Sequence, residues 1–189
     1  MDIMLFHSTF GLRPAVRAAA DRLRAAGHEV WTPDLFEGRT FETLEEARAH
    51  KNEVGLEELL KRAIAVAAPL SERGLVYAGF SLGAAIAQNL AFGDEKTRGL
   101  LLLHGTSDIA DGAEADGLPV QLHVADPDPM EPHDWLTAWY LQMGKTGADV
   151  EVHRYPGAGH LYTDPDMPDY DEEAAEQTWR VALGFLETL

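Results

Sequence analysis

The stretch Leu75-Val76-Tyr77-Ala78-Gly79-Phe80-Ser81-Leu82-Gly83 passes from an apolar run of strand-forming residues to a helical pattern that begins at Leu82. It contains the pattern Gly-x-Ser-x-Gly around Ser81. A serine on a tight strand-to-helix turn needs small neighbours, because a Cβ at either glycine would collide with the adjoining strand or helix. The stretch therefore predicts a strained turn that exposes the Ser81 hydroxyl at the end of a strand.

On both sides of this turn, short apolar runs alternate with longer segments of helical period. This alternation is typical of parallel strands joined by crossover helices. The expected strands cover residues 3–7, 29–32, 75–78, 100–104, 120–124 and 150–154. The expected helices cover residues 14–26, 56–68, 82–92, 133–143 and 172–186, whereas residues 36–52 show no clear pattern. We expect a single domain over residues 1–189, a three-layer α/β sandwich whose open, mostly parallel sheet has about six to seven strands with helices on both faces.

The composition narrows the classes of partner. Fifteen basic and 32 acidic side chains give a formal net charge of −17, which would repel nucleic-acid phosphates and anionic lipids. Such acidity is consistent either with ordinary solubility or with a salt-adapted source. No apolar stretch approaches the ~20 residues of a membrane span, and the N-terminus lacks the features of a secretion signal. We therefore expect a cytoplasmic protein that binds neither nucleic acid nor membranes.

Cysteine is absent, which excludes a disulfide framework, a thiolate nucleophile and a cysteine metal site. A nucleophile must therefore be another side chain, and Ser81 is the candidate. The Leu82 amide follows at the start of a helix, where unpaired N–H groups can stabilise the oxyanion of a tetrahedral intermediate. Ser81 and Leu82 thus predict a nucleophile and one oxyanion donor.

A serine nucleophile needs a base, and eight histidines compete for that role. His160 follows the last expected strand in the glycine-rich loop Tyr155-Pro156-Gly157-Ala158-Gly159-His160, which gives the imidazole room to approach Ser81. His7 and His104 end strands and could line a pocket, although a structural role is the simpler interpretation. The others lie at expected helix ends or within strands, and they are His28, His50, His123, His133 and His153.

The third member of such a site is an acid that orients the imidazole. The segment after residues 120–124 offers Asp126 and Asp128, both next to prolines, and Asp108 follows another strand. Among these we rank Asp128 first, Asp126 second and Asp108 third. The chain order serine, aspartate, histidine agrees with this assignment.

Three blocks in this order resemble the dienelactone hydrolase family of α/β-hydrolases, over nearly the whole chain. Residues Gly79–Ala84 are similar to the nucleophile turn of that family, Leu122–Pro132 to its acid loop and Tyr155–His160 to its histidine loop. Residues Trp31–Gly38 resemble a further recurring block. The resemblance implies an α/β-hydrolase-like fold.

The resemblance also selects Asp128 over Asp126 and implies that the Thr9 amide is the second oxyanion donor. It implies a covalent acyl-enzyme mechanism without a metal or an organic cofactor, in agreement with the absence of any clear metal-ligand spacing. Two features depart from the founding enzymes of the family. Ser81 and Ser8 stand where those enzymes have a cysteine nucleophile and a glutamate, and Asp164 lies where an arginine would hold a substrate carboxylate. Dienelactone is therefore a poor substrate candidate.

We predict a serine-dependent hydrolase of a small ester, lactone or thioester, acting as a monomer or homodimer. Phe10, Phe80 and Tyr162 are candidate substrate contacts, since they lie close to the catalytic motifs. Two alternatives stay open at this point. The chain could be a non-enzymatic binding or regulatory protein that has kept the fold, because fold does not guarantee activity. It could also be a thioesterase or an acyltransferase.

Overall fold

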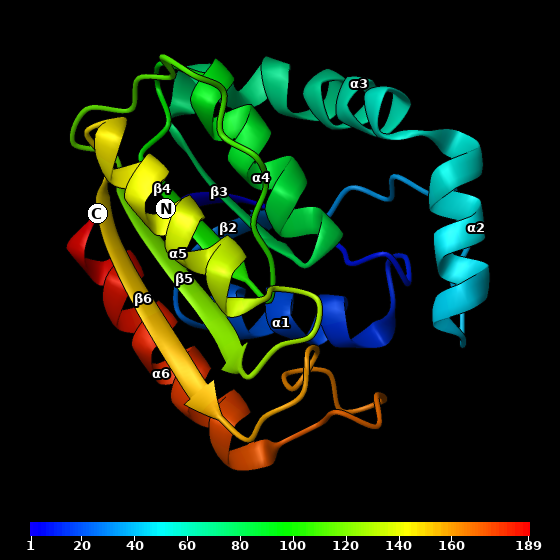
Figure 1. Cartoon of the computed structure of the whole chain (residues 1–189). Helices are drawn as coiled ribbons and strands as arrows, with labels where there is room; N and C mark the ends of the chain where they lie inside the picture. Colours follow the sequence, from blue (N-terminus) through cyan, green and yellow to red (C-terminus); the bar gives the residue numbers. More distant parts are fainter.

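The computed structural model describes residues 1–189, in which six strands form one sheet (Figure 1). The strands are β1 (Asp2–Phe6), β2 (Glu29–Trp31), β3 (Leu75–Phe80), β4 (Gly99–Leu103), β5 (Pro119–Asp126) and β6 (Asp149–Pro156). Their order is β2-β1-β3-β4-β5-β6, and every neighbouring pair is parallel. The predicted open parallel sheet is therefore confirmed, with six strands.

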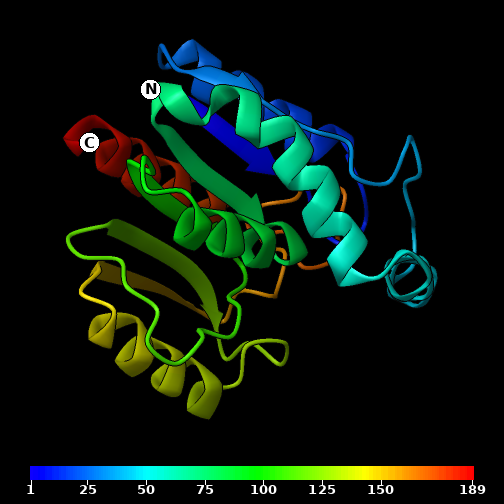
Figure 2. The ribbon, with the colours of Figure 1, turned by 90° about the horizontal axis from the view of Figure 1, so that it is seen from above.

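Helices cover both faces of the sheet, as Figure 2 shows from above. They are α1 (Pro14–Ala25), α2 (Leu44–Val54), α3 (Leu56–Ala67), α4 (Leu82–Gly93), α5 (His133–Lys145) and α6 (Glu172–Thr188), with a short 3₁₀ helix at Ala68–Arg73. Helices α1 and α6 pack on one face, and α3, α4 and α5 pack on the other. The predicted three-layer sandwich is confirmed.

Strand β3 shows how the two faces share the apolar residues. Val76, Ala78 and Phe80 belong to the core cluster that contains α1 and α6, whereas Leu75 and Tyr77 belong to the opposite cluster. Successive side chains of a strand point to opposite faces, so a strand covered on both sides is apolar at every position. All six residues of β3 are buried accordingly.

Helix α2 is the main addition to the predicted elements, and it occupies part of the segment that showed no clear pattern. It projects beyond the sheet in both views (Figures 1 and 2), and Ala47 is its only fully buried side chain. Its start is fixed by Thr43, whose hydroxyl oxygen accepts a bond from the Glu46 amide and whose O–H donates to the Glu46 carboxylate. The bond from the Glu46 amide satisfies one unpaired donor of the first turn, which helps to stabilise a helix that buries little apolar surface.

The topology brings the carboxyl ends of all strands to one edge of the sheet. The chain reverses its direction of progress across the sheet between β1 and β3, and ligands in open α/β sheets bind outside the strand ends at such a point. The loops after β1, β3, β5 and β6 meet there. None of the helices combines the length and the apolar composition that crossing a bilayer requires.

Candidate active site

Ser81 lies between the end of β3 and the start of α4, in a backbone conformation that non-glycine residues rarely adopt. Its φ is 51° and its ψ is −108°, and its amide donates to the Leu103 carbonyl at 2.8 Å. Such a conformation costs free energy and persists only where the surrounding structure enforces it. The turn directs the serine side chain away from the sheet, as the sequence predicts.

Close backbone packing enforces this turn. A Cβ on Gly83 would lie 2.6 Å from the His7 carbonyl oxygen and closer still to that of Phe6, so α4 could not approach β1 with any other residue there. A Cβ on Gly79 would overlap the Gly83 backbone, and one on Gly105 would lie 2.8 Å from the Ser81 Cα. Three glycines therefore allow the neighbouring chain segments to hold the turn in place.

One chain of hydrogen bonds joins Ser81, His160 and Asp128. The Ser81 Oγ lies 2.9 Å from His160 Nε2, and His160 Nδ1 lies 2.7 Å from Asp128 Oδ2. A carboxylate can only accept, so the imidazole carries its proton on Nδ1 and leaves Nε2 free to accept from the serine hydroxyl. This order of hydrogen bonds is the one that a serine nucleophile would need.

The loops after β5 and β6 place the acid and the histidine. Both strands run in register up to the pair Asp126 and Pro156, so the two loops leave the sheet side by side. The Asp128 side chain has no exposed surface, and its second oxygen accepts from the Met130 amide at 2.8 Å. His160 keeps 13% of its side chain exposed, which leaves it open to substrate and water.

The structure does not bring the two lower-ranked acids to His160. Asp126 is the last residue of β5, and its carbonyl accepts from the Gly157 amide. Asp108 is exposed, and its carbonyl accepts from the Gln88 side chain. Of the three candidates, only Asp128 bonds the imidazole.

The two residues expected to supply the oxyanion donors lie at the start of α4 and in the loop after β1, and Thr9 lines the same cavity as Ser81. Leu82 is the first residue of α4, where amides have no partner within the helix. The Thr9 amide, in the loop after β1, donates to no other backbone group. His7 holds this loop, since its Nδ1–H donates to the Ser8 carbonyl at 2.7 Å and its Nε2 accepts from the Leu35 amide. Burial lowers the pKa of His7, which favours this neutral form.

A cavity of about 290 Å³, here called the serine cavity, opens beside Ser81 and His160. Thr9, Phe10 and Met130 also line it, so Phe10 lies where a substrate contact is expected. Arg48 of α2 lines it as well, and its guanidinium contacts the Met130 sulfur at 3.3 Å without a carboxylate partner. Sequence reasoning missed Arg48 because α2 itself showed no pattern.

Two of the expected substrate contacts lie elsewhere. Tyr162 has no exposed surface, and its hydroxyl bonds Thr178 of α6 at 2.7 Å, so this residue supports the histidine loop from within the core. Phe80 points to the α1 and α6 face with Val76 and Ala78, because side chains alternate along β3. It therefore lines a second cavity between those helices instead of the serine cavity.

Glu131, a buried glutamate close to Asp128, was also not predicted from the sequence. Glu131 accepts from the Thr106 amide at 3.2 Å and from its hydroxyl at 2.6 Å, while Trp135 donates to the same hydroxyl oxygen. Burial raises the pKa of Glu131 although both bonds to Thr106 oppose this. The network ties the acid loop to the segment after β4, where Gly105 packs on Ser81. No local pattern signals it, because its partners are 25 positions apart in the chain.

His104 occupies a second special position, at the end of β4. It is buried with a φ of 64°, and its Nε2 lies 2.6 Å from the Thr163 hydroxyl. Burial, followed by the nearby His160, lowers the pKa of His104 well below its usual value, so it is neutral beside the catalytic candidate. Nowhere do three His, Asp or Glu side chains gather closely enough to hold one metal ion.

The model of the dienelactone hydrolase family matches residues 2–189 of the chain. No curated protein matches it in sequence. Among solved structures, the dienelactone hydrolase-like promiscuous phosphotriesterase P91 from metagenomic libraries is similar with a TM-score of 0.81 at 19% identity, over 98% of this chain and 85% of that one. A candidate dienelactone hydrolase from Klebsiella pneumoniae gives 0.79 at 17% identity, over 100% and 87%.

A phospholipase/carboxylesterase from Dyadobacter fermentans is also similar, with a TM-score of 0.70 at 18% identity over 96% of this chain and 89% of that one. At these identities the structural likeness establishes the fold, which is that of the α/β-hydrolases. The family assignment rests on the sequence match over residues 2–189.

Proposed function

This chain belongs to the dienelactone hydrolase family, which makes it an ester-bond hydrolase, and we propose that it cleaves a small ester, lactone or thioester through an acyl-enzyme on Ser81. The observation that carries the proposal is the bonded chain from the Ser81 Oγ through His160 to the buried Asp128, built on a strained turn. Because cysteine is absent, the acyl group is carried on an oxygen.

In the first half of the reaction, the Ser81 Oγ attacks the acyl carbonyl while His160 Nε2 takes its proton. The carbonyl oxygen becomes an oxyanion, which the Leu82 and Thr9 amides stabilise by donating hydrogen bonds. Asp128 stabilises the imidazolium that forms. The tetrahedral intermediate then collapses, the bond to the leaving alcohol or thiol breaks, and His160 returns the proton to that group.

In the second half, water attacks the acyl-serine while His160 Nε2 takes a proton from it. The same amides stabilise the second oxyanion, and collapse breaks the bond between the acyl carbon and the Ser81 Oγ. His160 then gives its proton to that oxygen, which restores the free serine and releases the acid. Every step uses the single imidazole position seen in the structure.

Hydrolysis of p-nitrophenyl acetate by three variants tests the proposal. Ser81→Ala and His160→Ala should each lose several orders of magnitude in kcat, since removing a triad member leaves only the contribution of the oxyanion donors and binding. Ser71→Ala is a matched control, because the Ser71 hydroxyl bonds only the Ala68 carbonyl, outside the serine cavity. If either site variant keeps the activity of the control, the proposal is wrong.

A further inference from the structure

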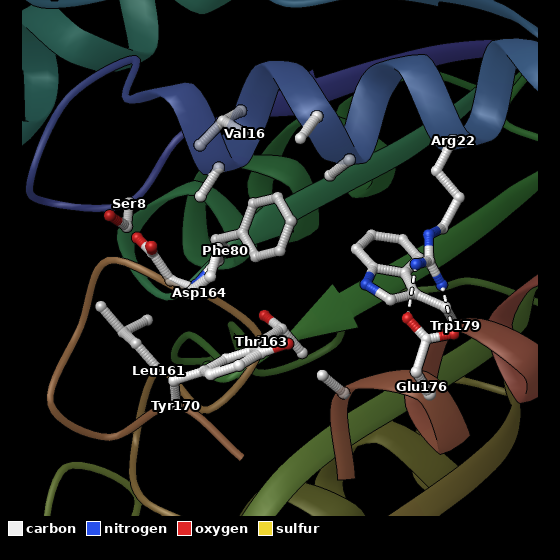
Figure 3. Close-up of a pocket in the computed structure, with 15 residues that line it drawn as sticks. Ser8, Val16, Arg22, Phe80, Leu161, Thr163, Asp164, Tyr170, Glu176 and Trp179 are labelled. Carbon is white, nitrogen blue, oxygen red and sulfur yellow. Dashed lines mark hydrogen bonds and ion pairs between the residues drawn. The ribbon is translucent and has the colours of Figure 1, made fainter. Parts of the chain in front are cut away.

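A second cavity, of about 190 Å³, lies between α1, α6 and the loop that follows His160 (Figure 3). We call it the α1–α6 cavity. Figure 3 shows the rings of Phe80 and Trp179 projecting into the space between helix α1 and this loop, with Tyr170 on the loop side. Nine of the 15 residues that line it are hydrophobic, so its walls offer apolar contacts beside polar side chains.

This cavity adjoins the serine cavity. Ser8 and Leu161 line both of them, and each is the chain neighbour of a catalytic candidate, Thr9 in one case and His160 in the other. Phe80, on the wall of the α1–α6 cavity, directly precedes Ser81. The two cavities therefore share a wall, formed by Ser8 and Leu161.

The volume selects the size of the group that fits. An apolar cavity of roughly 150 Å³ is known to hold one benzene molecule, so the 190 Å³ here accommodates a single six-membered ring. The α1 wall leaves this space open because its side chains there are small, with Ala15, Ala18 and Ala19 on the lining.

The charges around the cavity select an uncharged group. Asp164 lines the cavity with 13% of its side chain exposed, and burial raises the pKa of its carboxyl although Arg13, 3.8 Å away, opposes this. Arg22 also lines the cavity, but Glu176 pairs with it through two hydrogen bonds, which Figure 3 marks. The lining therefore offers a bound carboxylate no unpaired cation, because its one arginine already pairs with Glu176.

We propose that the α1–α6 cavity binds an uncharged, ring-sized group of the substrate while its ester bond lies at Ser81. This inference rests on the proposed function and narrows it to esters that carry one aromatic or alicyclic ring. The ring packs against Phe80 and Trp179, whose own rings meet edge to face with centroids 6.3 Å apart, and the group that joins it to the ester passes Ser8 and Leu161. The substrate class is thus distinct from acidic lactones.

The test compares three esters by acid release at constant pH, namely methyl acetate, benzyl acetate and methyl 3-phenylpropanoate. Ala18 is exposed on α1 and lines the cavity, so Ala18→Phe fills this space without disturbing the core. It should lower kcat/KM for at least one ring-bearing ester roughly 10- to 100-fold, the worth of burying one ring, and leave methyl acetate within about twofold. Ala25→Phe, exposed on the same helix but away from the cavity, is the control.

A binding measurement supplies a second readout that needs no catalysis. In the Ser81→Ala variant, benzyl alcohol should shift the NMR resonance of the Trp179 indole N–H, whereas benzoate at the same concentration should not. The inference is wrong if Ala18→Phe affects all three esters equally or neither ring-bearing ester, or if benzyl alcohol leaves the indole resonance unmoved. Full activity in Ser81→Ala would instead refute the proposed function itself, so the two failures are distinguishable.

Discussion

Replacing Asp128 by asparagine changes one heavy atom yet should remove most of the catalytic power. In the native site, Asp128 Oδ1 accepts from the Met130 amide at 2.8 Å and Oδ2 faces His160 Nδ1 at 2.7 Å. An asparagine has only one acceptor oxygen. If its NH₂ group faced Met130, two donors would meet in a site where the side chain has no exposed surface, at a cost of about 1–3 kcal/mol.

The asparagine should therefore turn its NH₂ group toward His160. The imidazole must then accept at Nδ1 and carry its proton on Nε2, where it can no longer accept from the Ser81 hydroxyl. A wrong tautomer of this kind costs roughly 10⁴-fold in kcat. The fold should be nearly unaffected, because a well-placed amide still bonds both neighbours.

The assay is the initial rate of p-nitrophenyl acetate hydrolysis, with the free energy of unfolding measured in urea on the same samples. Asp126→Asn is the control, since Asp126 lies on the same segment but its carboxylate does not bond the imidazole. A loss of less than about tenfold for Asp128→Asn, or an equal loss for both variants, would refute the reasoning about the tautomer.

Three further substitutions test the structural account. Gly83→Ala should lower the free energy of unfolding by about 1–3 kcal/mol or more, because the new Cβ would press on the backbone of Phe6 and His7. In the control Gly144→Ala on α5 the new Cβ meets no other atom, so the free energy of unfolding should rise by up to about 1 kcal/mol. Equal effects of the two substitutions in thermal melts would contradict this. Thr43→Ala should destabilise α2 by about 1 kcal/mol, because the helix loses its N-terminal cap. Amide hydrogen exchange in α2 measures this effect, and unchanged exchange rates would contradict the prediction. Burial lowers the pKa of His123 to about 3, so the imidazole binds a proton at higher pH in the unfolded chain than in the folded one. The free energy of unfolding should therefore fall by up to about 1.4 kcal/mol per pH unit below about pH 6. Urea titrations should show a flatter fall for His123→Gln, and identical slopes in both proteins would exclude a contribution of His123 to the pH dependence.

Residues with strong local signals could be placed from the sequence. Ser81 lies in a glycine-flanked turn where the sequence pattern changes from that of a strand to that of a helix, and His160 ends a glycine-rich loop after a strand. Because the strands are parallel, both residues lie at the same edge of the sheet. Asp128 needed a choice between neighbouring acids. Their hydrogen-bonded arrangement is seen in the structure, while their catalytic roles stay predictions.

Residues whose surroundings come from distant segments could not be placed in this way. Tyr162 is close to His160 in sequence, but its hydroxyl finds Thr178 of α6, and Glu131 finds Thr106 across the site. The position of Phe80 could have been predicted, because side chains alternate along β3 and this puts Phe80 on the other face of the sheet from Tyr77. One sequence feature indicates the start of α2, namely Thr43 three positions before Glu46. The helix has a single buried side chain and therefore shows no apolar repeat.

The most direct test of the central claim is intact-mass and peptide analysis after reaction with a fluorophosphonate, which phosphonylates only an activated serine. The wild-type protein should gain one phosphonyl group, located on Ser81, and His160→Ala should react far more slowly. An unlabelled wild-type protein, or a label on another serine, would contradict the claim that the imidazole of residue 160 activates this hydroxyl.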